Sequence, residues 1–256
     1  HEGAGVVAEV GEEVKNVAPG DKVTTLGGQA FAEFYKTDCR NVAKVPESVQ
    51  DLSYWISEPA TCVVNGIRGS AIEIGDNVCL IGCGYMGLLL LQAMPKTYVG
   101  NLFALDVRDE RLELAKRFGA EHAVNSAKVN PVETVRNILQ SEADVVIEAS
   151  GAPRTLYLAT DLVRKGGKLV IFGRHVIDEK VPTEIWHSNG IKVLNTAPNS
   201  SLNFNKDFHD AVRLLAKGVF DQKPLVTHKF PWENPEKALK TASEKPTDYI
   251  KGVITF

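Results

Sequence analysis

The chain has 256 residues, of which 44% are hydrophobic, and a formal net charge of −3. This length suffices for one large domain or two small ones, and the composition is that of an ordinary globular protein. The sequence has no dense Lys/Arg cluster and no apolar run near the ~20 residues that a membrane span needs, so we expect neither a nucleic-acid nor a membrane partner.

Four cysteines are spread through the chain, with no CxxC pair and no spacing typical of a disulfide framework: Cys39, Cys62, Cys79 and Cys83. Because such cysteines stay reduced in the cytosol, and because no charged-then-apolar leader is visible, we expect a cytoplasmic protein. The first residue is His1, and the segment from Gly3 already has the pattern of a strand. We therefore expect an N-terminal portion to precede this sequence.

Short strands and turns dominate the first part of the chain. Strand-like segments run over 3–10, after the turn at Pro19-Gly20-Asp21, over 31–35 and over 41–45. Frequent short strands with Gly and Pro in their turns are typical of a small barrel or sandwich. The segment 225–256 returns to this pattern, so we predict short strands there too.

The middle of the chain alternates between strands and helices. A helix is predicted over 58–68, and another over 206–217 closes this region. Between them we predict strands over 77–81, 101–105, 122–125, 144–148 and 168–172, and helices over 85–94 (ended by Pro95), 110–118, 131–139 and 153–164. Strands that alternate with helices form βαβ units, which build a parallel sheet covered by helices on both faces.

A glycine-rich turn joins the predicted strand at 77–81 to the helix at 85–94. Its sequence, Gly82-Cys83-Gly84-Tyr85-Met86-Gly87, matches the pattern GxGxxG. In that pattern the first glycine permits a tight turn, the second leaves room for a pyrophosphate, and the third lets the helix approach the sheet. The helix N-terminus offers free N–H groups to the phosphates. The strand–helix context favours a dinucleotide site over a turn without a ligand.

A carboxylate follows at the end of the next predicted strand, as Asp106. In this position it could accept hydrogen bonds from the adenosine ribose hydroxyls and would repel a 2′-phosphate, which favours NAD over NADP. Two alternatives stay open. Arg108, two residues later, leaves room for mixed cofactor use, and Asp106 could simply be a helix N-cap.

Several segments together resemble the medium-chain dehydrogenase/reductase superfamily, and its zinc-dependent polyol (sorbitol) and threonine dehydrogenase branch fits best. The resemblance covers essentially the whole chain. The segments that carry it are His1-Glu2-Gly3-Ala4-Gly5-Val6-Val7, Val10-Gly11, Pro19-Gly20-Asp21-Lys22-Val23, Glu58-Pro59, Glu148–Gly151, Gly166–Gly173 and Lys251–Ile254.

The resemblance implies an α/β fold in which a Rossmann doubly wound parallel sheet is inserted in a GroES-like β-barrel catalytic domain. We expect residues 1–66 and 222–256 to form the catalytic domain, in part, and residues 67–221 to form the dinucleotide-binding domain. A homodimer or homotetramer is also implied. The predicted NAD-binding residues are Gly82, Cys83, Gly84, Tyr85, Met86, Gly87, Asp106, Arg111, Ser150 and Gly173.

The resemblance also implies a catalytic zinc ion held by a cysteine, the histidine of a Gly-His-Glu motif and a glutamate, with a fourth position for water or substrate. Carried over to this sequence, His1 is the imidazole ligand, Glu2 is a ligand or a close partner of the metal, and Glu58 is the carboxylate ligand or bonds the metal-bound water. These three are also the predicted catalytic residues. The cysteine ligand would lie upstream of His1. We expect no structural zinc, because Asp21–Ala30 lacks the closely spaced cysteines of such a site.

The residues assigned to the metal and cofactor sites could also have simpler structural roles. His1 could be a tag or a frayed end, and Glu58 could serve only as a favourable charge at a helix N-terminus. Cys62 shares a helix face with Glu58 and is an alternative ligand, against the usual role of a small buried residue. His175 follows the predicted strand at 168–172, where it could approach the cofactor or be a solvated loop residue.

We therefore predict a zinc-dependent oxidoreductase that transfers a hydride between NAD and a small-molecule secondary alcohol, either a polyol or sugar alcohol or an amino alcohol. Zinc would lower the pKa of the alcohol, and the nicotinamide would take the hydride. Two alternatives stay open. One is a zinc-free quinone or enone reductase of the same fold, a branch that usually lacks the His-Glu and Glu-Pro pairs. The other is an inactive nucleotide-binding fragment.

Overall fold

The computed structural model describes residues 1–94 and 99–256. The chain divides into two compact units, one made of His1–Val64 with Asn203–Phe256 and the other of Asn65–Leu202. Helix α1 (Glu58–Ser70) begins in the first unit and ends in the second. The segment 203–221 groups with the two chain ends, whereas our sequence boundaries assign it to the dinucleotide-binding domain. The domain assignment itself stays a prediction.

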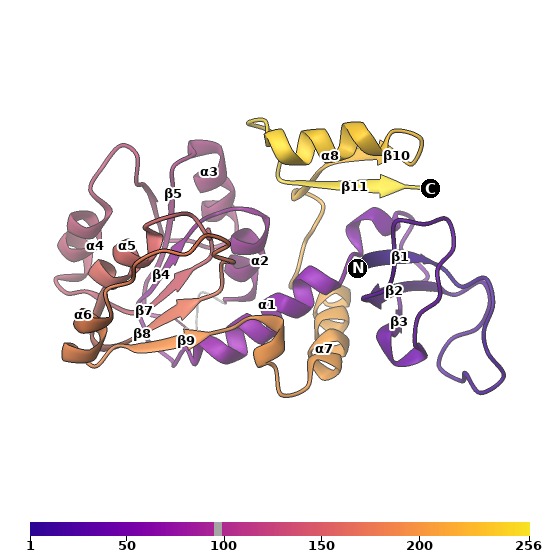
Figure 1. Ribbon diagram of the computed structural model, residues 1–256, viewed down its shortest axis with the longest axis horizontal. Coiled ribbons are helices and arrows are strands. Elements are labelled where there is room, and N and C mark those ends of the chain that lie inside the picture. Colours follow the sequence, from indigo (N-terminus) through magenta and orange to yellow (C-terminus); the bar gives the residue numbers. More distant parts are fainter. Residues whose placement is uncertain (95–98) are drawn as a thin grey trace. The chain divides into compact units, whose positions relative to one another are not determined.

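The second unit contains a six-stranded sheet (Figure 1). Its strands pair in the order β6-β5-β4-β7-β8-β9, and every pairing is parallel. The order reverses between β4 and β7, as in a doubly wound dinucleotide-binding sheet, so the predicted Rossmann fold is confirmed. The strands are β4 Val78–Ile81, β5 Leu102–Asp106, β6 His122–Asn125, β7 Ala143–Glu148, β8 Val163–Ile171 and β9 Lys192–Asn195.

Among the described residues, the α-helices that lie wholly in this unit are α2 Tyr85–Ala93, α3 Asp109–Arg117, α4 Pro131–Leu139, α5 Thr155–Leu162 and α6 Thr183–Ser188. The start of α4 is fixed by Asn130, whose side chain accepts hydrogen bonds from the N–H groups of Val132 and Glu133. The start of α2 differs, because its N-cap is Gly84 and no side chain caps it. Pro95, which we expect to end this helix, lies outside the described residues.

The apolar core of the second unit explains its sequence pattern. Strand β4 is buried along its whole length, and Leu88–Leu91 of α2 have no exposed surface. One buried cluster joins Phe103 and Val146 of the sheet to Val135 of α4 and Leu156 of α5. Parallel strands that are covered on both faces read as continuous apolar runs rather than as alternating ones.

The first unit contains two small sheets. Strands β1 (Glu2–Val6), β2 (Lys22–Leu26) and β3 (Val42–Lys44) form an antiparallel sheet in that order. Strands β10 (Val226–Pro231) and β11 (Lys251–Thr255) pair in parallel. Helices α7 (Phe204–Ala216) and α8 (Pro235–Glu244) complete the unit. In neither unit is a described helix both long and apolar enough to cross a membrane.

The structure corrects the predicted elements in three places and adds two elements. No strand forms over 31–35, where Phe31 and Phe34 are 77% and 74% exposed and so do not mark a buried face. The segment 225–256 contains α8 as well as strands, because Pro235 at its first position and a run of good helix formers favour a helix. Helix α5 is shorter than predicted, since Val163 already belongs to β8. We made no prediction for α6 or β9.

Candidate functional site

The glycine-rich turn between β4 and α2 has the geometry that its motif requires. Gly82 has a φ of +97°, and a Cβ at this position would lie 2.9 Å from the backbone nitrogen of Ser150. A Cβ on Gly87 would collide with the carbonyl oxygen of Gly82, so only glycine lets α2 approach the turn this closely. At Gly84, in contrast, no atom lies within 4 Å of an added Cβ. This open space beside an uncapped helix N-terminus fits a pyrophosphate group.

Asp106 ends β5 next to this turn. Its Oδ2 atom accepts a hydrogen bond of 2.7 Å from the N–H of Cys83, and its Oδ1 atom accepts one of 3.0 Å from the N–H of Arg108. Cys83 is fully buried, and burial, followed by the charge of Asp106, raises the pKa of its thiol. Arg111 of α3 is also buried, and desolvation, followed by repulsion from Arg108, lowers its pKa. The structure thus gathers Asp106, Cys83 and Arg111.

Ser150 and Gly173 follow the two neighbouring strands, β7 and β8. The register pairs Ile81 of β4 with Glu148 of β7, and Glu148 with Ile171 of β8, so the three strands end at the same edge of the sheet. Ligands of open parallel sheets bind at the carboxyl ends of the strands, next to the point where the strand order reverses. The predicted residues therefore lie where a dinucleotide is expected, and their contact with a cofactor stays a prediction.

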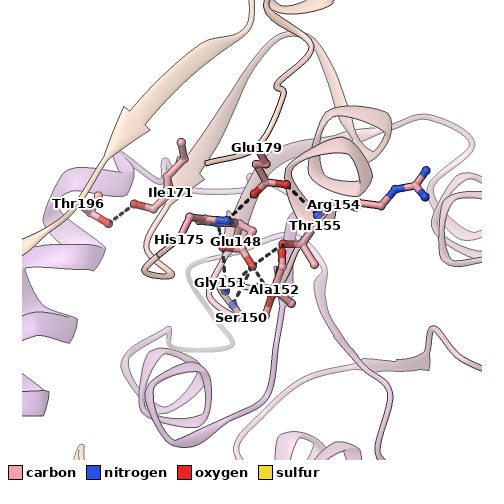
Figure 2. Close-up of polar contacts among 10 residues, drawn as sticks. All are labelled: Glu148, Ser150, Gly151, Ala152, Arg154, Thr155, Ile171, His175, Glu179 and Thr196. Atoms are coloured by element: carbon pink, nitrogen blue, oxygen red, sulfur yellow. Dashed lines mark hydrogen bonds and ion pairs between the residues drawn. The ribbon is translucent and has the colours of Figure 1, made fainter. Parts of the chain in front are cut away.

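A buried polar network that we did not predict lies at this edge (Figure 2). Glu148 is fully buried and accepts hydrogen bonds from the N–H groups of Ser150 (2.8 Å) and Gly151 (3.0 Å) and from the hydroxyl of Thr155 (3.0 Å). His175 contacts Glu148 as well, and its side chain is only 14% exposed, so it is not a solvated loop residue. A carboxylate at the end of an apolar strand was the sequence signal for this network.

A second candidate site lies in the first unit. His1, Glu2 and Glu58 each offer a ligand atom, and these atoms all lie within 4.8 Å of one another. The Nε2 atom of His1 is 3.6 Å from the Oε1 atom of Glu58. One imidazole and two carboxylates at this spacing form a donor set that zinc accepts. The three predicted ligands therefore come together and fit the metal that the sequence resemblance implies.

Burial and like charge act on the carboxylates of this cluster. Desolvation, followed by the charge of Glu2, raises the pKa of Glu58. Lys251 of β11 forms an ion pair with Glu2, and no local sequence signal could have predicted a partner so far along the chain.

The Sγ atom of Cys62 lies 3.4 Å from the Oε1 atom of Glu58, to which it donates a hydrogen bond. Burial, followed by the charge of Glu58, raises the pKa of this thiol, which favours the donor over a thiolate ligand.

Comparisons with known proteins show which proteins this chain resembles. A family model described as "zinc-binding dehydrogenase" matches residues 86–217, which is just over half of the chain. The L-threonine 3-dehydrogenase of Bacillus velezensis is 27% identical, over 93% of this chain and 76% of the relative. The sorbitol dehydrogenase of Mus musculus is 26% identical, over 95% of this chain and 76% of the relative. A solved structure from Escherichia coli CFT073, described as a short chain alcohol dehydrogenase complexed with NADH, matches with a TM-score of 0.85 and 26% identity, over 100% of this chain and 83% of that one.

Proposed function

The chain belongs to the zinc-binding dehydrogenase family, and on this premise we propose that it transfers a hydride between a secondary alcohol and NAD, with one catalytic zinc ion and no structural zinc. The observation that carries the proposal is the cluster of His1, Glu2 and Glu58 in a chain that also holds the Gly82–Gly87 turn. The proposed substrates are polyols, sugar alcohols or amino alcohols, because the relatives include a sorbitol and a threonine dehydrogenase. We also propose a homodimer or homotetramer in the cytoplasm.

The residues at the sheet edge would bind and orient the dinucleotide. The N–H groups at the N-terminus of α2 would hold the pyrophosphate beside Gly84, where an added Cβ meets no atom. Asp106 would accept hydrogen bonds from the adenosine ribose, which supports NAD over NADP. The bound cofactor supplies the hydride chemistry, and the protein fixes where the nicotinamide lies.

In the first unit, His1, Glu2 and Glu58 would hold the zinc ion. When bound, zinc supplies a Lewis acid that favours the ionised form of an alcohol near neutral pH. Two carboxylates in one cluster repel each other, and the ion pair between Lys251 and Glu2 offsets part of that repulsion. Lys251 thereby helps to keep the ligand set assembled before the metal arrives.

The zinc content of the protein, purified without a histidine tag, tests this proposal. We expect about one zinc ion per chain, as for a single catalytic site. The variant Glu58→Ala should lose zinc and alcohol oxidation but keep its affinity for NADH. The matched control is Glu9→Ala, which removes an exposed carboxylate from the same unit and should change neither.

Two other results would replace the proposal with its alternatives. A folded protein that binds NADH but holds no zinc would overturn the assignments of His1, Glu2 and Glu58, and quinones and enones would then be screened as substrates. A protein that holds zinc and NADH but oxidises no polyol, sugar alcohol or amino alcohol would favour a nucleotide-binding protein without catalysis.

A further inference from the structure

The segment after β8 is tied to the end of β7 through His175. The Nε2 atom of His175 lies 2.8 Å from the Oε2 atom of Glu148, and its Nδ1 atom lies 2.8 Å from the Oε1 atom of Glu179. Figure 2 shows the imidazole ring between the two carboxylates. Each ring nitrogen of His175 therefore contacts one carboxylate oxygen, so the imidazole is held at both ends.

The two carboxylates are anchored to different parts of the unit. Glu148 belongs to β7, and the turn that follows this strand donates three of its hydrogen bonds. The Oε2 atom of Glu179 accepts a hydrogen bond of 2.9 Å from the N–H of Arg154, at the start of α5. His175 therefore closes a bridge that fastens the segment 173–179 to the turn between β7 and α5.

Other contacts show how closely this segment is fitted to Glu148. The N–H of Gly173 donates a hydrogen bond of 2.7 Å to the backbone oxygen of Glu148. A Cβ on Gly173 would lie 2.5 Å from the Oε2 atom of Glu148, so there is no room for a side chain. Between His175 and Glu179 the chain is more exposed, since Val176 and Ile177 are 75% and 69% exposed. The fixed part next to β8 is thus 173–175.

This fixed part forms a wall of a pocket of about 440 Å³ at the carboxyl ends of β8 and β9. The wall includes Gly173, Arg174 and His175, and the apolar side of the pocket includes Leu156 and Phe172. Under the proposed function, Asp106 binds the adenosine half of the dinucleotide at the end of β5. The strand order places β7, β8 and β9 on the other side of β4, so the nicotinamide half would extend toward this pocket.

We propose that His175 is a positioning residue for the nicotinamide half of the cofactor, because its bridge between Glu148 and Glu179 fixes the pocket wall at residues 173–175. The inference rests on the proposed function, since it needs a nicotinamide cofactor at this edge. Removing the imidazole would leave residues 173–175 held through Gly173 and would open the link between Glu148 and Glu179. The adenosine half, bound at β4 and β5, would keep its contacts.

Binding of NADH and of ADP-ribose, which lacks the nicotinamide, separates this role from a general loss of structure. In titrations of the whole chain, His175→Ala should weaken NADH binding by about tenfold and leave ADP-ribose binding within about twofold of the unmodified protein. In alcohol oxidation, the KM for NAD should rise more than kcat falls. The matched control is His187→Ala, an exposed histidine of α6 in the same unit, which should change neither affinity.

A second variant covers the case in which His175→Ala does not fold. Glu179→Gln keeps the side-chain size at the outer end of the bridge but removes its charge, and it should weaken NADH binding by a smaller factor with ADP-ribose unaffected. Equal weakening of NADH and ADP-ribose, or unchanged NADH binding in both variants, would overturn the role of His175. If the unmodified protein binds neither NADH nor ADP-ribose, the proposed function itself fails, and this inference fails with it.

Discussion

The cofactor turn and the metal-ligand cluster are built in opposite ways. The turn uses consecutive residues, Gly82–Gly87, and its shape comes from backbone positions at the ends of neighbouring strands. The cluster uses the side chains of His1, which precedes β1, of Glu2 in β1 and of Glu58 in α1. Lys251 from β11 pairs with Glu2. A site formed by backbone atoms should lose its ligand when a substitution adds a side chain. A site formed by charged side chains should lose its ligand when a substitution removes a charge. The following variants test this contrast, from the largest expected effect to the smallest.

Gly87→Ala should have the largest effect, because its Cβ would collide with the carbonyl oxygen of Gly82. Alanine favours a helix over glycine by only about 1 kcal/mol, while forcing an extra carbon into a closely packed position costs about 1–3 kcal/mol or more. We expect a lower Tm in calorimetry and loss of most NADH binding. The matched control is Gly84→Ala, whose Cβ meets no atom and whose φ of −71° suits alanine.

Gly84→Ala should therefore keep its Tm and lose only cofactor affinity, because the added methyl group would occupy space proposed for the pyrophosphate. An equal fall in Tm for both variants would mean that the two glycines have the same structural role, and the contrast between packing and ligand space would be wrong.

Asp106→Asn should change cofactor choice rather than stability. The amide keeps the size of the side chain and an oxygen that can accept the N–H of Cys83, but it removes the charge that repels a 2′-phosphate. We expect the ratio of the Kd for NADPH to the Kd for NADH to fall by about tenfold, which corresponds to about 1.4 kcal/mol. Zinc content should not change. An unchanged ratio in fluorescence titrations would show that Asp106 acts only as a cap.

Lys251→Met should weaken the metal site while leaving the cofactor site intact. The change keeps an unbranched side chain but removes the cation that pairs with Glu2. Loss of a residue that orients a metal ligand typically costs about tenfold or more in affinity. Competition with a zinc chelator would measure this change, and NADH titration is the control. Unchanged zinc affinity would mean that Glu2 does not depend on its partner.

Asn130→Ala should have the smallest effect and sets the reference for stability alone. Its side chain caps α4, and removal of such a cap costs about 1 kcal/mol. Chemical denaturation should show this loss, with zinc content and NADH affinity unchanged. If this variant also bound NADH more weakly, a modest loss of stability would by itself reduce cofactor affinity. The affinity changes measured for the other variants would then have to be compared with that of Asn130→Ala.

The sequence allowed the cofactor region to be predicted far better than its surroundings. The turn, the strand before it and the helix after it are local features, so a motif of six residues is enough to identify them. The ion pair between Lys251 and Glu2 and the bridge through His175 depend on how distant segments meet, and spacing along the chain does not encode that. The error at 31–35 has another cause, because Phe31 and Phe34 are aromatic residues of a type that is common in strands but are exposed here.

The burial of Cys83 has a consequence for the redox chemistry of the protein itself. A thiol attacks oxidants and alkylating reagents as its thiolate, and burial that raises the pKa of Cys83 makes this form scarce. Cys79, in the strand before the turn, is buried in the same way and its pKa is raised for the same reason. The cysteines in and before the glycine-rich turn should therefore react slowly with peroxide and maleimides. A label directed to the less buried Cys39 should leave the turn unmodified.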